Sequence, residues 1–241
     1  MNDRPIGIFD SGIGGLNVLS ECRKLMPNEN YVYLADEAGM PYGNKSDAEI
    51  KLAAERCAYI LFSMNCKALA VACNTATAVA ITHLRTMFPS SIIIGLEPAV
   101  KPCIKELGIN ESAVALVTSG TMRSQKFKRL LNSCDGRITP VAAPELAAKI
   151  EHCRDGKDAD DIKNYIGEVL LPYKTARAVI LGCSHYAYVK DVISEFYGGN
   201  IKIYDGATGA AERLAYCLNI ANLRSDRVGN GDVAFYSTTI K

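Results

Sequence analysis

The sequence lacks an excess of charge of either sign. Its 27 lysines and arginines balance 26 aspartates and glutamates, which leaves a formal net charge of +1. A nucleic-acid-binding surface needs basic groups to neutralise phosphates, so nucleic acid is not the expected partner. No apolar run reaches the roughly 18 residues that a membrane-spanning helix requires, so no membrane segment is expected.

The sequence also lacks the marks of a secreted or disulfide-bonded chain. Its first residues, MNDRPIGIFDSG, show no basic region followed by an apolar stretch, so we expect no signal peptide and a cytoplasmic location. The nine cysteines are odd in number, and no two are spaced C-x-x-C. This pattern argues against a disulfide framework, a zinc ribbon and a thioredoxin-type pair. In a reducing cytoplasm these thiols are expected to be mostly free.

Short β-branched runs alternate with longer segments of helical periodicity. Expected strands cover 5–9, 31–35, 67–72, 92–95, 113–117, 137–141, 177–181, 201–204 and 232–238. Expected helices cover 15–25, 75–87, 123–132, 145–153, 158–171 and 207–218. A further helix should follow Ser46, which forms a potential capping box with Glu49. Strands that alternate with helices predict an α/β fold with parallel sheets covered on both faces.

The pattern restarts near the middle of the chain. Residues 8–12 align with 116–120 at an offset of 108, and residues 70–74 align with 180–184 at an offset of 110. We interpret this as an internal duplication that produces two pseudo-symmetric α/β domains. We expect one domain to comprise 1–94 plus 207–241 and the other 95–206. Ligands bind at the carboxyl ends of strands in such sheets, so the site should lie in the cleft between the domains.

Two cysteines follow apolar strands at equivalent places, Cys73 in ACNT and Cys183 in GCSH. A following helix offers free N–H groups and a partial positive charge, which lower the pKa of a thiol. Inversion of a stereocentre needs one group on each face, and two similar thiols across a cleft suit that task. We expect the other cysteines to be structural: Cys22, Cys57, Cys66, Cys103, Cys134, Cys153 and Cys217.

The glycine-rich turn that follows Asp10 leaves several interpretations open. Its backbone N–H groups could approach an anionic ligand, or Asp10 could be a solvated residue of a tight turn. The turn also resembles a dinucleotide fingerprint, with Asp36 where a ribose-binding acid would lie. Against the dinucleotide, Asn17 occupies the third glycine position, and Asp10 would lie beside the pyrophosphate.

His185 lies two residues after Cys183 and is a candidate acid–base partner for it. The same two side chains could also ligate a metal. No further cluster of ligating residues accompanies them in the sequence, so no metal site is expected.

The motifs together resemble a known family. They are IGIFDSGIGG at 6–15, PYG at 41–43, CNT at 73–75, EPA at 97–99 and LGCSH at 181–185. In this order and spacing they resemble glutamate racemases, a family of the aspartate/glutamate racemase superfamily. The resemblance implies cofactor-independent interconversion of L- and D-glutamate, with D-glutamate supplied to peptidoglycan synthesis. It also implies a small-molecule substrate and, as is common in the family, a homodimer.

The resemblance implies roles for individual residues. Cys73 would abstract the Cα proton of D-glutamate, and Cys183 that of L-glutamate. Asp10 would assist the first thiol and His185 the second. An acidic residue seven positions after a proline also assists the second thiol in the family, and Glu151 has that spacing from a proline.

The implied substrate-binding residues would hold two carboxylates and an ammonium by backbone N–H and hydroxyl groups. They are Ser11, Pro41, Tyr42, Gly43, Asn74, Thr75, Thr118, Thr121 and Ser184. Some motif positions depart from the family pattern: Gly39 stands where arginine is common, and Ser184 replaces a common threonine. An alternative substrate is therefore aspartate or another acidic amino acid. A non-catalytic, two-lobed ligand-binding module is the alternative from a different class.

Overall fold

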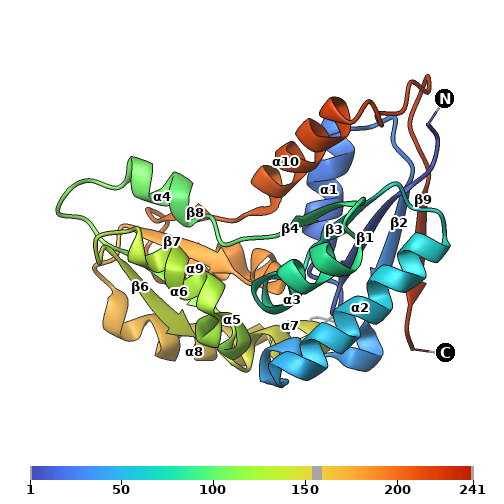
Figure 1. Ribbon diagram of the computed structural model, residues 1–241. Helices are drawn as coiled ribbons and strands as arrows, with labels where there is room; N and C mark the ends of the chain where they lie inside the picture. The colour runs from blue at the N-terminus through green and yellow to red at the C-terminus, as the bar shows by residue number, and fades with distance from the viewer. Residues whose placement is uncertain (1, 154–158, 240–241) are drawn as a thin grey trace.

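The computed structural model describes residues 2–153 and 159–239, and these fold around two parallel sheets (Figure 1). The first sheet has the strand order β4-β3-β1-β2-β9, and the second has the order β6-β5-β7-β8. The strands of the first sheet are β1 (Ile6–Asp10), β2 (Tyr31–Ala35), β3 (Ala68–Val71), β4 (Ile92–Gly95) and β9 (Val233–Ser237). Those of the second are β5 (Ala113–Val117), β6 (Ile138–Ala142), β7 (Ala178–Gly182) and β8 (Lys202–Tyr204). The predicted α/β class with two parallel-sheet domains is confirmed.

Helices cover both faces of the first sheet. One face packs on α1 (Leu16–Leu25) and α10 (Ala207–Ile220), and the other packs on α2 (Asp47–Ser63) and α3 (Asn74–Met87). Figure 1 shows α10, in red, lying beside α1 although the two are far apart in sequence. The buried strands carry apolar residues on both faces, as expected for a doubly covered parallel sheet.

The second sheet is covered in the same way. Helices α4 (Val100–Glu106) and α6 (Gln125–Asn132) pack on one face. Helices α7 (Leu146–His152), α8 (Ala159–Leu170) and α9 (Lys190–Phe196) pack on the other. Short helix α5 (Ser119–Arg123) follows β5, and 3-10 turns cover Glu37–Gly39, Tyr42–Asn44, Leu171–Tyr173 and Ser184–Val189.

The two sheets share one strand order. If β1, β2, β3 and β4 are matched with β5, β6, β7 and β8, the order β4-β3-β1-β2 corresponds to β8-β7-β5-β6. The offsets near 110 residues found in the sequence place the same strands in correspondence. The first sheet then gains one strand, β9, at its β2 edge. The duplication inferred from sequence is thus reproduced in the topology.

Local sequence signals account for most element boundaries. Ser46 and Glu49 form the expected reciprocal capping box at the start of α2. The helix expected over 123–132 is α6, which begins two residues later because Ser124 ends α5 and caps α6 by accepting from Phe127 N–H. Helices α4, α5 and α9 were not predicted. α4 contains Pro102 near its start, a position where the missing N–H breaks no helical bond.

Within residues 2–153 and 159–239, no helix is long and apolar enough to cross a membrane.

Candidate active site

The candidate residues gather at the carboxyl edges of both sheets. Asp10 ends β1, Cys73 lies two residues beyond β3, and Thr118 and Cys183 directly follow β5 and β7. All four are at most 8% exposed. Equivalent strands of the duplicated fold therefore deliver one thiol from each domain to a shared, buried region.

The first thiol, Cys73, occupies the N-cap of α3. Its Sγ accepts from Ala76 N–H at 3.5 Å and lies 4.0 Å from Ser11 Oγ. Burial raises the pKa of Cys73, a negative charge on Asp10 raises it further, and the Ala76 N–H opposes both. The expectation of a lowered pKa from the helix N-terminus is therefore wrong for this structure, because burial outweighs the N–H groups.

The second thiol, Cys183, precedes a 3-10 turn at Ser184–Val189 and not an α-helix. Its Sγ lies 4.0 Å from His185 Nδ1. The other nitrogen of that ring, Nε2, lies 2.7 Å from Glu151 Oε2, and both side chains are at least 90% buried. The expected partners His185 and Glu151 thus form an imidazole–carboxylate pair behind Cys183.

Asp10 bridges the two domains. Its Oδ2 accepts from the N–H groups of Gly12 and Gly15, at 3.2 and 3.1 Å, and its Oδ1 accepts from Ser184 Oγ at 3.0 Å. Burial raises the pKa of Asp10, while the charge of His185 and these donors lower it. Asp10 is therefore not a solvated residue of a surface turn.

The glycine-rich turn packs directly against the second domain. A Cβ on Gly12 would lie 2.8 Å from Glu151 Oε2, and a Cβ on Gly14 would lie 2.6 Å from Ser184 Oγ. Ile13 also crosses the interface, because its N–H lies 3.4 Å from Glu151 Oε2 and its carbonyl accepts from Tyr188 at 3.1 Å. Glycine is needed here for close approach between domains. Sequence reasoning noted the turn but missed this packing.

Hydroxyl groups also meet at the interface between the two domains. Thr75 Oγ1 and Thr118 Oγ1 are 2.8 Å apart across the domains, and Thr118 also donates to Thr121 Oγ1 at 3.1 Å. Gly43 contacts the same place, since a Cβ there would lie 3.1 Å from Thr118 Cβ. Four of the expected substrate-binding residues therefore meet in one cluster.

The remaining expected residues differ in their surroundings. Asn74 is 3% exposed, and its Nδ2 donates to Leu96 carbonyl at 3.2 Å. Its buried Oδ1 accepts no hydrogen bond from the described residues. Pro41 follows a cis peptide bond in the loop before Tyr42. The Tyr42 hydroxyl donates to Asp36 Oδ2 at 2.7 Å, so the phenol is directed at that carboxylate.

The dinucleotide interpretation does not fit these contacts. Asp36 is fully buried and accepts from Tyr42, Arg56 and Thr238, so its oxygens do not face an open ribose site. The N–H groups of Gly12 and Gly15 are directed at Asp10. Among the described residues, no group of three or more His, Cys, Asp or Glu side chains is arranged to hold a metal ion.

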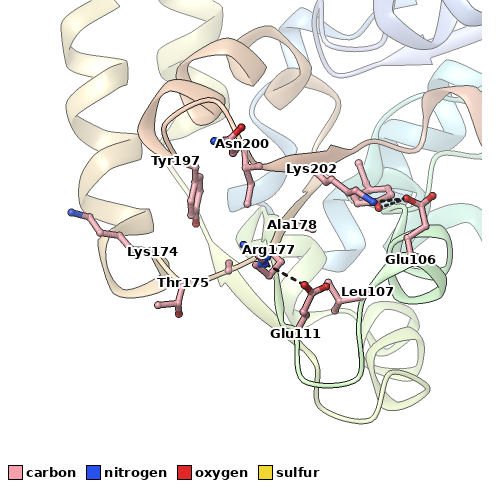
Figure 2. A pocket seen from close by; sticks show the side chains of 13 residues that line it. Glu106, Leu107, Glu111, Lys174, Thr175, Arg177, Ala178, Tyr197, Asn200 and Lys202 are labelled. Carbon is pink, nitrogen blue, oxygen red and sulfur yellow. Dashed lines mark hydrogen bonds and ion pairs between the residues drawn. The ribbon is translucent and has the colours of Figure 1, made fainter.

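A cavity of about 530 Å³ lies at the opposite, amino-terminal edge of the second sheet (Figure 2). Four of its charged groups form two pairs, Arg177 Nε with Glu111 and Lys202 Nζ with Glu106, each at 3.2 Å. Neither thiol lines this cavity. It therefore belongs to a different part of the molecule from the candidate active site.

Comparisons with known proteins agree with this geometry. The profile of the family described as Asp/Glu/Hydantoin racemase matches residues 16–214. The chain is 36% identical to glutamate racemase of Clostridium perfringens over 99% of this chain and 92% of that protein. It also resembles the crystal structure of glutamate racemase isoform RacE1 from Bacillus anthracis, with a TM-score of 0.88 and 28% identity. That comparison covers 100% of this chain and 90% of the other. The crystal structure of glutamate racemase from Francisella tularensis in complex with D-glutamate is also similar, with a TM-score of 0.84 and 26% identity. That comparison covers 100% of this chain and 90% of the other. The chain belongs to the Asp/Glu/hydantoin racemase family.

Proposed function

We propose that this protein interconverts L- and D-glutamate by moving the Cα proton. The observation that carries this proposal is the pair of buried thiols, Cys73 and Cys183, which follow equivalent strands of the two domains. They lie close enough that a negative charge on Cys183 raises the pKa of Cys73. The similarity to glutamate racemases over nearly the whole chain supports the choice of substrate.

The reaction needs one proton removed and one delivered. With D-glutamate, the Cys73 thiolate takes the Cα proton, the C–H electron pair remains as a carbanion, and the Cys183 thiol protonates the opposite face. With L-glutamate the two thiols exchange roles. Asp10 assists proton transfer at the first thiol, Cys73. The His185–Glu151 pair accepts or returns the proton of the second thiol, Cys183.

The buried site addresses the weak acidity of a Cα–H bond. Each pKa unit between this bond and the thiol adds about 1.4 kcal/mol to proton transfer. Exclusion of water strengthens the interaction of fixed donors with the developing carbanion and carboxylate charge. Burial also raises the pKa of the Cys73 thiol, and the ammonium of an incoming substrate favours its thiolate.

The polar groups around the thiols suit an amino acid with two carboxylates. The unpartnered Oδ1 of Asn74 is an acceptor for the substrate ammonium. Hydroxyls of Thr75, Thr118 and Thr121 and backbone N–H groups of the Gly43 loop are donors for carboxylates. Ser11 lies beside Cys73 and Ser184 beside Cys183, where each can contact the substrate.

The repeated strand pattern supports domain boundaries of 1–94 plus 207–241 and 95–206. From the family resemblance we also propose action without a cofactor and a homodimer. The product D-glutamate would supply peptidoglycan synthesis in the cytoplasm, and so cell wall and cell shape. Because the site is buried, substrate entry requires the two domains to separate.

Uptake of deuterium at Cα from D₂O tests the proposal. The purified protein is incubated with L- or D-glutamate and with L- or D-aspartate, and loss of the α-proton signal and chirality are both followed. We expect exchange and inversion with both glutamate enantiomers. Faster exchange with aspartate would reassign the substrate, and absence of exchange with all four would contradict racemase activity. Ligand binding that survives loss of both thiols would favour a binding module.

A further inference from the structure

A hydrogen-bonded cluster connects the last strand of the first sheet to the loop that carries Tyr42 and Gly43. Strand β9 pairs with β2, and the register continues when Thr238 N–H donates to Ala35 carbonyl at 3.0 Å. The Thr238 hydroxyl donates to Asp36 Oδ1 at 2.8 Å and accepts from Ala38 N–H at 3.1 Å. One side chain therefore joins β9 both to a buried carboxylate and to the turn that precedes the loop.

Asp36 connects Thr238 to the loop, because its carboxylate accepts hydrogen bonds from both Thr238 and Tyr42. Its Oδ2 accepts from the Tyr42 hydroxyl at 2.7 Å, and its Oδ1 also accepts from Arg56 at 2.6 Å. Burial raises the pKa of Tyr42, with Cys57 and Asp36 adding to the shift, so the phenol remains a donor. A Cβ at Gly39 would lie 2.0 Å from Asp36 Oδ2, so the turn passes directly over the carboxylate.

The loop ends inside the candidate active site. Gly43 follows Tyr42 and packs against Thr118. The hydroxyl of Thr118 is hydrogen-bonded to that of Thr75 in the other domain. A shift of Tyr42 would therefore move a backbone segment that lies against the substrate-binding hydroxyls. Displacements of about 1 Å in such segments are large enough to affect catalysis.

We propose that Thr238 is a positioning residue for the substrate-binding loop, acting through Asp36 and Tyr42. This inference rests on the proposed racemase function, because the loop is assigned to glutamate binding there. It extends the functional machinery to a segment about 200 residues from the loop in sequence. The neighbouring Ser237 and Thr239 hydroxyls donate instead to Glu37 at the surface, so they provide matched controls.

Steady-state kinetics of three single variants test the inference. Thr238→Val removes the hydroxyl and keeps the shape, and we expect KM for both glutamate enantiomers to rise about fivefold or more, with kcat within about twofold. Thr238→Ser, which retains the hydroxyl, should restore the wild-type KM. Thr239→Val, which disturbs the same segment without touching Asp36, should leave KM unchanged.

A second variant covers the case in which Thr238→Val fails to fold. Tyr42→Phe removes the phenol donor at the other end of the cluster and should raise KM similarly. The double variant should then show no further increase, because both changes interrupt one connection. A wild-type KM in Thr238→Val, or an equal rise in Thr239→Val, would overturn the inference. Wild-type protein without Cα exchange would instead contradict the proposed function.

Discussion

The two halves of the candidate active site come from equivalent strands, yet different groups surround their thiols. Cys73 caps an α-helix and has a carboxylate, Asp10, nearby. Cys183 precedes a 3-10 turn and is followed by His185, which is paired with Glu151. The position of the thiol is thus the same in both domains, while the side chains around it differ.

This difference has a mechanistic consequence. In the proposed mechanism each thiol acts on one face of the substrate, so each set of partners should control one of the two proton transfers. Enantiomers have equal free energies, so a variant must change kcat/KM equally in both directions. The asymmetry of the site can therefore appear only in measurements that identify which proton transfer limits the rate.

Removal of either thiol should have the largest effect. Cys73→Ala and Cys183→Ala each eliminate the only group proposed for one face, and we expect kcat/KM to fall about 10³-fold or more in both directions. Polarimetry or circular dichroism of the product measures this loss. Cys217→Ala on α10, outside the site, is the control and should retain activity. Substantial activity in either thiol variant would contradict the two-thiol mechanism.

Glu151→Gln should have the next largest effect. The substitution preserves the shape but removes the charge that pairs with His185 Nε2 at 2.7 Å. We expect kcat/KM to fall about 10²-fold, because the imidazole loses the group that stabilises its protonated form. Glu145→Gln, on the solvent-exposed side of the same region, is the control. Similar losses in both variants would show that the effect is structural.

Asp10→Asn should reduce activity about tenfold and change the pH dependence of stability. Burial raises the pKa of Asp10 above its ordinary value of 3.8, so the folded state binds this proton more tightly than the unfolded state. The wild type therefore loses stability as the pH rises through the folded pKa. Urea unfolding between pH 4 and 8 should show the variant gaining stability relative to the wild type as pH increases. A difference that is constant or falls with pH would contradict this interpretation.

Tyr188→Phe should have the smallest effect. It removes one hydrogen bond between the domains, from a side chain that is 50% exposed, and leaves the thiols and their partners in place. We expect a loss in kcat/KM of about threefold. Tyr216→Phe, on the exposed surface of α10, is the control and should leave kcat/KM unchanged. A loss comparable to that of Glu151→Gln would mean that domain contact matters more than the acid–base pair.

Local signals made much of the fold predictable. β2, β4 and β5 begin and end where the sequence placed them, because each is a short apolar run between turn residues. The repeated pattern around Cys73 and Cys183 predicted equivalent strand ends, and the topology confirms that equivalence. Helix α4 was not predicted, because a proline within a short segment usually indicates the end of a helix.

Contacts between distant segments could not be predicted in the same way. Gly14 is required by the approach of Ser184, which no local pattern indicates. Asp36 follows a strand and was compared with a ribose-binding acid, yet its partner Thr238 lies far along the chain. The raised pKa of Cys73 likewise could not be predicted, because it results from burial in the folded protein, and a local sequence motif gives no information on burial.

The asymmetry between the two halves is tested most directly by the kinetic isotope effects of Cα-deuterated L- and D-glutamate. In Glu151→Gln, transfer at Cys183 should become limiting, so the effect should increase for L-glutamate and decrease for D-glutamate. In Asp10→Asn the shifts should be reversed. Shifts in the same direction in both variants, or no change from the wild type, would contradict the assignment of one set of partners to each thiol.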